Sequence, residues 1–134
     1  MIFVDTAFWI GLTIPRDPHH VEAQGLFQSH AADQLVTSNH VRGESWTVLR
    51  RKAGHPVAVR FLQLLARTTR IDTVFVPEHL EDTAIAWLRR REERDYSFVD
   101  ATSFALMREL GIRRALTFDE DFEAAGFNVL RAEA

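Results

Sequence analysis

Four acidic side chains stand at positions where the sequence pattern ends a strand or begins a helix. They are Asp5, Glu44, Asp100 and Asp119. Carboxylates that are brought together repel one another, and their pKa values rise unless a cation lies between them. Mg²⁺ and Mn²⁺ prefer oxygen ligands and often keep waters that a phosphate group can displace. The pattern therefore indicates a divalent metal site that would act on a phosphate compound.

The elements that must position these acids alternate between strands and helices. Short apolar or β-branched runs predict strands at 2–4, 35–37, 70–76, 115–117 and 127–130. Apolar spacing and capping signals predict helices at 6–12, 39–53, 56–67 and 98–110, two more that begin near 17 and 77, and a short one around 122. Asp17 is expected to be the N-cap of its helix, with Pro18 at the first helical position. This alternation is typical of a single α/β domain, here residues 1–134, with a parallel sheet between helices.

A parallel sheet would bring the four acids together, because the carboxyl ends of its strands form one edge, where ligands bind. Each acid also has a purely structural explanation, which the pattern leaves open. Asp5 is a favourable N-cap, and 97–100 has the spacing of a capping box. Residues 117–120 can be read as another capping box, in which Asp119 has no role. Glu44 could be a solvent-exposed residue of its helix.

Four segments around these acids resemble the acidic motifs of PIN-domain ribonucleases, and in particular those of VapC toxins from type II toxin–antitoxin modules. They are 4–9 (VDTAFW), 39–44 (NHVRGE), 96–107 (YSFVDATSFALM) and 116–122 (LTFDEDF). The resemblance covers the whole chain in the expected order. It implies a three-layer α/β/α sandwich with a central, mainly parallel sheet of about four to five strands.

The resemblance also implies roles for individual residues. The four acids match the metal-binding residues of the family, and none of these is missing. Asp121 matches a variable acid that can bind a second ion. Thr6 and Ser97 match the small hydroxyl residues that support the site.

The function that the resemblance implies is a metal-dependent endoribonuclease toxin, which inhibits translation by cleaving structured RNA, either ribosomal RNA or tRNA. Mg²⁺, or Mn²⁺ in its place, would activate a water for in-line attack, leaving a 5′-phosphate and a 3′-hydroxyl. The implied partners are a second copy of the chain, as a homodimer, and a VapB-type antitoxin. The alternative is a catalytically silent PIN-type module that binds RNA or protein, and cleavage of RNA with added metal separates the two.

Two arginine clusters near expected helix ends are candidate RNA contacts. One consists of Arg50, Arg51 and Lys52, and the other of Arg89, Arg90 and Arg91 with Arg94. The residues singled out for RNA contact are Arg50, Arg51, Arg89 and Arg90. RNA affinity depends on such phosphate contacts, although the same charges could instead stabilise the helix dipoles. His40 precedes Glu44 by one helical turn, and no other histidine is placed to complete a zinc site. We therefore expect His40 to contact RNA or to support the site.

Composition excludes several other classes of protein. The chain has 134 residues, a formal net charge of −3 and no cysteine, which rules out disulfides and cysteine-ligated metals. It has neither a signal-peptide pattern nor an apolar run of about 18 residues, so a cytoplasmic protein without membrane contact is expected. A receiver domain would need a lysine after its last strand, but Lys52 is the only lysine. A haloacid-dehalogenase-like phosphatase would need an acid at position 7, where Ala7 stands.

Overall fold

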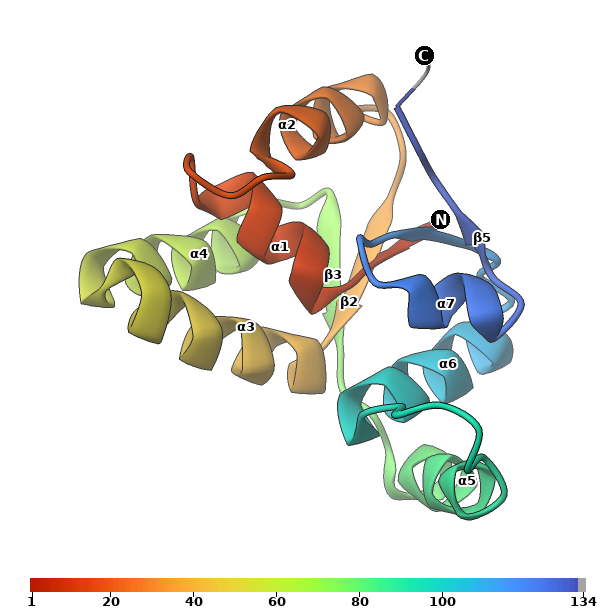
Figure 1. The fold of residues 1–134 in the computed structure, drawn as a ribbon. Coiled ribbons are helices and arrows are strands. Elements are labelled where there is room, and N and C mark those ends of the chain that lie inside the picture. Colours follow the sequence, from red (N-terminus) through yellow and green to blue (C-terminus); the bar gives the residue numbers. More distant parts are fainter. Residues whose placement is uncertain (133–134) are drawn as a thin grey trace.

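A five-stranded sheet forms the centre of the computed structural model, which describes residues 1–132 (Figure 1). The strands are β1 (Ile2–Val4), β2 (Leu35–Ser38), β3 (Ile71–Val74), β4 (Arg114–Leu116) and β5 (Asn128–Val129). Their order is β3-β2-β1-β4-β5, and every pair of neighbours is parallel. This arrangement confirms the predicted α/β class and its parallel sheet.

Helices cover both faces of the sheet. Within residues 1–132 they are α1 (Thr6–Thr13), α2 (His20–Ser29), α3 (Asn39–Ala53), α4 (His55–Arg67), α5 (Glu78–Arg89), α6 (Phe98–Leu110) and α7 (Glu120–Ala124). The chain moves outward from β1 to β3, then crosses back to β4 and on to β5. Because crossovers between parallel strands are right-handed, this order puts α1–α4 on one face and α5–α7 on the other. Figure 1 shows the first group at the left and top and the second at the lower right.

Local signals explain where the helices nearest the site begin and end. Ser38 caps α3, because its Oγ accepts a 3.0 Å hydrogen bond from Val41 N. Gly54 ends α3 with a φ of 93°, a conformation that glycine adopts without strain. Gly111 ends α6 in the left-handed helical conformation, with a φ of 69° and a ψ of 25°.

The start of α2 was predicted two residues too early. The helix begins at His20, and Asp17 instead closes a turn, because its Oδ1 accepts a 2.8 Å hydrogen bond from His19 N. Pro18 lies in this turn rather than at the first helical position. An Asp that accepts a hydrogen bond from the backbone two residues later is the signature of an Asx turn, which competes with N-capping. The strands β3 and β5 are also shorter than predicted.

The aromatic core packs against the centre of the sheet. Phe104 of α6 is fully buried, and its ring lies 4.9 Å from Phe122 and 5.5 Å from Trp87. On the other face, Trp9 is fully buried and donates through Nε1 to Thr37 Oγ1 at 3.4 Å. Within residues 1–132, every helix is too short or too polar to span a lipid bilayer.

The strand order identifies where a ligand would bind. The chain leaves β1 toward β2 on one side, and β4 pairs with β1 on the other side. Ligands of open parallel sheets bind beyond the carboxyl ends of strands where the order reverses. Asp5 follows β1 and Asp119 lies shortly after β4, so both acids lie at this switch point.

Candidate metal centre

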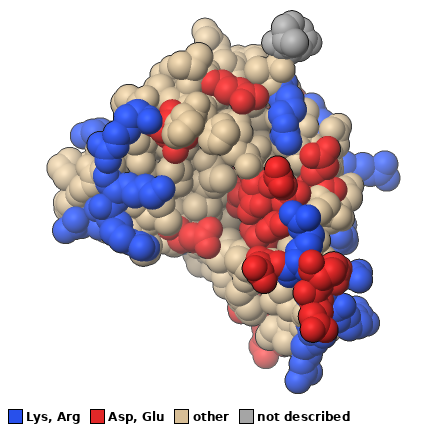
Figure 2. Space-filling view, in the orientation of Figure 1, with Lys and Arg blue, Asp and Glu red and all other residues tan. Residues whose placement is uncertain are grey.

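Three of the predicted acids converge at the switch point. Asp5, Asp100 and Asp119 each offer a carboxylate oxygen, and these oxygens lie within 4.8 Å of one another. They line a pocket of about 340 Å³ together with Thr6, Ala7, Glu44, Asp95, Ser97 and Asp121. In Figure 2 the acidic side chains concentrate beside α7 with basic side chains among them, and further basic side chains lie at the left and right edges of the same face.

Asp5 is the most deeply buried member of the cluster, with 2% of its surface exposed. Its Oδ2 accepts a 2.9 Å hydrogen bond from Thr117 Oγ1, which in turn accepts one of 3.0 Å from Asp119 N. Its Oδ1 is buried and has no hydrogen-bond partner. Although Asp5 precedes α1, its side chain accepts no capping bond, so helix capping does not explain this residue.

Asp100 and Asp119 each combine a structural role with a place in the cluster. Asp100 N donates to Ser97 Oγ at 2.9 Å and Ser97 N donates to Asp100 Oδ2 at 3.3 Å, which is the capping box that the spacing suggested. Asp119 caps α7, because its Oδ1 accepts from Asp121 N at 2.9 Å. These bonds hold both carboxylates in place and leave oxygens for a cation.

The electrostatics of the cluster favour a bound cation. Burial raises the pKa of Asp5 to about 7, and repulsion from Asp100 adds to this. Burial and repulsion from Asp119 raise the pKa of Asp100 to about 6, and burial also raises the pKa of Asp119. Three neighbouring carboxylates with raised pKa values, together with the unpartnered Asp5 Oδ1, fit a hard divalent ion with oxygen ligands.

Four other predicted site residues border the same pocket. Glu44 lines it from α3 but lies outside the cluster of three. Thr6 is buried, and its Oγ1 has no hydrogen-bond partner. Ser97 lines the pocket and holds Asp100, as a supporting hydroxyl would. Asp121 also lines the pocket, but its Oδ1 is bound by Arg94, so a role as ligand of a second ion stays a prediction.

Comparison with known proteins identifies the family. The sequence pattern of the PIN domain matches residues 2–128. The chain belongs to the PIN-domain family. It is 50% identical over 137 aligned residues to the 23S rRNA-specific endonuclease VapC20 of Mycobacterium tuberculosis, covering 99% of this chain and 100% of that protein. This relationship confirms the predicted likeness to VapC toxins.

Two solved structures share the fold of this chain. The crystal structure of Mycobacterium tuberculosis VapC20, described as a sarcin–ricin loop cleaving toxin, superposes with a TM-score of 0.93 at 47% identity. The match covers 98% of this chain and 100% of that one. FitAcB from Neisseria gonorrhoeae gives a TM-score of 0.70 at 13% identity, covering 98% of this chain and 97% of the other, which supports the fold alone.

The candidate RNA contacts of this PIN domain lie outside the pocket. Arg50 and Arg51 are exposed in the last turn of α3, and Arg89 and Arg90 are exposed at the end of α5. Their positions suit both phosphate contact and the helix dipole, so their role stays a prediction.

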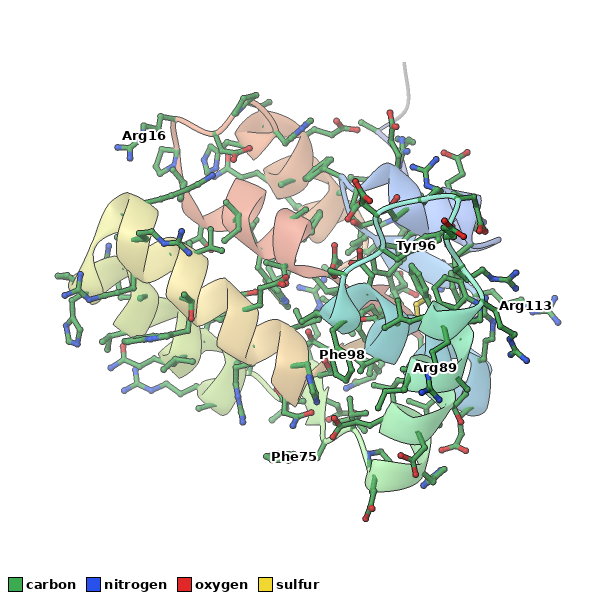
Figure 3. All side chains as sticks on the ribbon, turned by 60° about the horizontal axis from the view of Figure 1, so that its bottom comes forward. Arg16, Phe75, Arg89, Tyr96, Phe98 and Arg113 are labelled. Atoms are coloured by element: carbon green, nitrogen blue, oxygen red, sulfur yellow. The ribbon has the colours of Figure 1, made fainter. Side chains whose placement is uncertain are left out.

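His40 does not join the acids of the pocket. Its Nε2 lies 3.9 Å from Glu81 Oε2, and its ring lies 6.0 Å from that of Phe98. Phe98 is 41% exposed, and Figure 3 shows it between the starts of α3 and α6. This placement beside the site is compatible with RNA contact and does not suit metal binding.

The roles of two residues of the site, and one ion pair at its rim, were not predicted from the sequence. The pattern marks Thr117 only as the end of a strand or the start of a capping box, yet it bonds to Asp5 112 positions away. Asp95 lies in a charged loop where nothing distinguishes it from its neighbours. Arg94 was assigned to the second basic cluster, and its ion pair with Asp121 was not predicted. The one local signal that could have identified Thr117 is its hydroxyl, which stands two residues before an acid at the end of a strand.

Proposed function

We propose that this chain is a metal-dependent endoribonuclease toxin of a type II toxin–antitoxin module, and that it cleaves 23S ribosomal RNA. The observation that carries the catalytic part is the cluster of three carboxylates at the switch point, with a buried Asp5 oxygen that lacks a partner. The substrate is inferred from the 50% identity to VapC20 along nearly the whole chain. The description of VapC20 as a sarcin–ricin loop cleaving toxin makes this loop the first RNA to test.

Asp5, Asp100 and Asp119 would hold the divalent ion. Glu44 of α3 lines the same pocket and would be a further ligand. Mg²⁺ is the proposed cofactor, with Mn²⁺ as its substitute, because both prefer carboxylate and water oxygens. When bound, such an ion polarises a phosphoryl oxygen and lowers the pKa of a coordinated water.

The remaining residues of the site orient these carboxylates. Thr117 fixes Asp5 through its hydroxyl and Asp119 through the backbone, and Ser97 fixes Asp100. Hydrogen-bonded groups behind the ligands preserve their geometry and typically contribute about 10- to 100-fold to metal affinity or activity. Preorganisation of this kind is what a phosphodiester reaction needs from a protein.

The RNA backbone is proposed to extend from the pocket toward the two arginine clusters. Glu44 borders the pocket, and Arg51 follows it by seven residues on α3, a rise of about 10 Å along the helix axis. Arg50 and Arg51 would bind RNA phosphates on the side of α3, and Arg89 and Arg90 would bind phosphates on the side of α5. His40 would contact RNA near Phe98. These cations would offset the negative potential that the acids present to RNA.

Two partners follow from the proposal. A VapB-type antitoxin would inhibit the nuclease, and a second copy of the chain would form a homodimer. Action on ribosomal RNA would take place in the cytoplasm. The proposed chemistry of the pocket requires neither the antitoxin nor the dimer.

The deciding experiment incubates purified protein with 23S rRNA and with ribosomes, and maps new RNA ends by primer extension. Asp5→Asn, Asp100→Asn and Asp119→Asn should each reduce cleavage by at least about 100-fold. Asp82→Asn, an exposed carboxylate on α5, is the matched control and should cleave normally. Chelation of divalent ions should stop cleavage and added Mg²⁺ should restore it.

Two outcomes would count against this function. Cleavage that persists in the Asp5→Asn protein would mean that the acids are not the catalytic site. RNA binding without any cleavage, with Mg²⁺ or Mn²⁺ present, would favour the catalytically silent module instead.

A further inference from the structure

Arg94 and Asp121 form an ion pair at the rim of the acidic pocket. Arg94 Nε donates to Asp121 Oδ1 at 2.9 Å, and Nη2 lies 2.9 Å from the same oxygen. Asp121 lines the pocket. Among the ion pairs within residues 1–132, this one alone includes a pocket-lining residue. Arg94 is therefore a cation fixed beside the carboxylates that a phosphodiester must approach.

The segment between α5 and α6 is anchored so that Arg94 keeps this place. Tyr96 N donates to Arg94 O at 2.9 Å. The Tyr96 ring packs edge-on against Trp87 at 4.7 Å and against the buried Phe104 at 5.9 Å. The same segment supplies Ser97 to the pocket lining. Core packing on one side and the site on the other thus fix the backbone that carries Arg94.

Asp121 connects Arg94 to the metal-binding cluster. Its backbone N–H donates to Asp119 Oδ1 at 2.9 Å, while its own Oδ1 accepts from Arg94. The side chain of Asp121 is 17% exposed and that of Arg94 is 40% exposed, so the guanidinium is accessible to a ligand. A guanidinium has five N–H donors, and the contacts to Asp121 occupy the edge formed by Nε and one Nη atom. The other donors are left for a second acceptor.

We propose that Arg94 binds an RNA phosphate next to the scissile bond, and that Asp121 is the positioning residue that holds the guanidinium there. The inference rests on the proposed function, because its ligand is the RNA of that same site. The planar fork of arginine matches two oxygens of a phosphate, and its charge persists at every physiological pH. A carboxylate on one edge and a phosphate on the other would keep the guanidinium rigid while RNA is bound.

This role differs from that of a second metal ligand, which the family resemblance suggests for Asp121. If Asp121 orients Arg94, its loss should weaken RNA binding and leave the response to metal intact. If Asp121 binds an ion, its loss should weaken the response to metal and act on RNA independently of Arg94. The two roles therefore predict opposite outcomes for the same variant.

The test uses the full chain with Asp100→Asn, which should bind RNA without cleaving it, and an RNA stem-loop with the sequence of the 23S sarcin–ricin loop as the probe. Arg94→Gln and Arg94→Lys are compared with Arg113→Gln. The control removes one exposed arginine just before β4, at the amino end of the strands, and Figure 3 shows Arg113 directed away from the body of the protein. Thermal melting establishes that each variant is folded.

Arg94→Gln should weaken binding of the probe by about 10-fold or more, the effect of losing hydrogen bonds to a charged group. It should also reduce the slope of log K against log salt concentration by about 0.7 to 0.9, the contribution of one phosphate contact. Arg113→Gln should leave both quantities unchanged. Arg94→Lys keeps the positive charge but loses the planar guanidinium. The salt slope should therefore return to its original value, while the affinity for the probe stays below that of the protein with Arg94.

Asp121→Asn completes a double-mutant cycle with Arg94→Gln. The effects of the two changes on RNA affinity should be non-additive, because Arg94→Gln removes the guanidinium and Asp121→Asn removes the carboxylate that orients it. In the background with Asp100 intact, Asp121→Asn should keep the rise in Tm that Mn²⁺ gives to the wild-type protein. Loss of that rise in Tm would mean that Asp121 is a metal ligand and would overturn its role in positioning Arg94.

Equal affinity and equal salt slope in Arg94→Gln and Arg113→Gln would overturn the inference. Wild-type activity separates this result from failure of the proposed function. If the wild-type protein cleaves 23S rRNA while the two arginine variants behave alike, only the role of Arg94 falls. If the wild-type protein neither binds nor cleaves 23S rRNA, both proposals fail.

Discussion

Thr117 Oγ1 donates a 2.9 Å hydrogen bond to Asp5 Oδ2, which joins the ends of two adjacent parallel strands across 112 positions of sequence. The same hydroxyl accepts from Asp119 N at 3.0 Å. One buried threonine therefore orients two of the three carboxylates in the cluster. The hydrogen bond also lowers the pKa of Asp5, opposing the larger effect of burial.

Replacing Thr117 by valine should impair the site while preserving the shape of the core. The change leaves Asp5 Oδ2 and Asp119 N without their partner, which costs about 1–3 kcal/mol of folding free energy. We expect affinity for Mg²⁺ and RNA cleavage to fall by about 10- to 100-fold. Calorimetric titration with Mn²⁺ and cleavage kinetics measure the two effects. Thr117→Ser keeps the hydroxyl and is the matched control, and equal losses in Val and Ser variants would contradict the role of the hydrogen bond.

The stability of the metal-free protein should depend on pH in a direction set by Asp5 and Asp100. Their folded-state pKa values, about 7 and about 6, lie above the ordinary value of 3.8. Between about pH 4 and 7 the folded state therefore binds more protons than the unfolded state, and the free energy of unfolding decreases as pH rises. The decrease should level off above about pH 7. Thermal melting in chelator, from about pH 5 to about pH 8, measures this slope.

Metal should reverse that pH dependence. Because a divalent ion binds the ionised carboxylates, its affinity should increase as pH rises through about 6 to 7, and the rise in Tm on adding Mn²⁺ should grow accordingly. Asp5→Asn should melt at a higher temperature than the wild type at about pH 8 without metal, and should lose most of the response to Mn²⁺. Asp82→Asn, on the exposed side of α5, should match the wild type in both respects. A metal-induced shift that is the same at about pH 5 and about pH 8 would be inconsistent with these pKa values.

The parts of the fold that could be predicted from the sequence are those fixed by nearby residues. Helices α3 and α6 have the bounds predicted for them, 39–53 and 98–110, because Ser38, Gly54 and Ser97 act on backbone groups within one turn. The acids at strand ends were predictable because a parallel sheet gathers its carboxyl ends at one edge. Asp17 misled the prediction because an Asx turn and an N-cap have the same local appearance.

The parts that could not be predicted depend on contacts between distant segments. Thr117 and Asp5 meet because β1 and β4 are neighbours, a pairing that neither segment encodes alone. Arg94 and Asp121 are 27 positions apart, and their contact depends on the path of the loop before α6. The separation of Glu44 from the tight cluster likewise reflects the placement of α3 against the sheet rather than any local pattern.

The two arginine clusters should contribute to RNA affinity and not to metal affinity. Charge removal at Arg50 and Arg51, or at Arg89 and Arg90, should weaken RNA binding. It should also reduce the salt slope by about 0.7 to 0.9 for each phosphate that the cluster no longer neutralises. Binding of the RNA probe at several salt concentrations measures this. A salt slope that is unchanged when all four are replaced by alanine would assign these side chains to the helix dipoles.

An antitoxin should inhibit the nuclease by covering the acids. A protein that places an arginine at Asp5, Asp100 and Asp119 would pair with all three carboxylates through a permanent charge and a bidentate fork. Co-expression of such a partner should restore growth to cells that produce the nuclease, and the purified complex should cleave RNA far more slowly than the free protein. Full cleavage by a stable, stoichiometric complex would exclude blockage of the site.

We infer that Asp5, Asp100 and Asp119 hold a divalent ion that RNA cleavage requires. The most direct measurement is anomalous scattering from crystals grown with Mn²⁺ at a concentration that supports cleavage. We predict a peak bounded by the three carboxylates, with metal–oxygen distances of about 2.0–2.3 Å, and its disappearance in Asp5→Asn crystals. No peak at this position, or a peak that survives in Asp5→Asn, would show that these three carboxylates do not form the metal site.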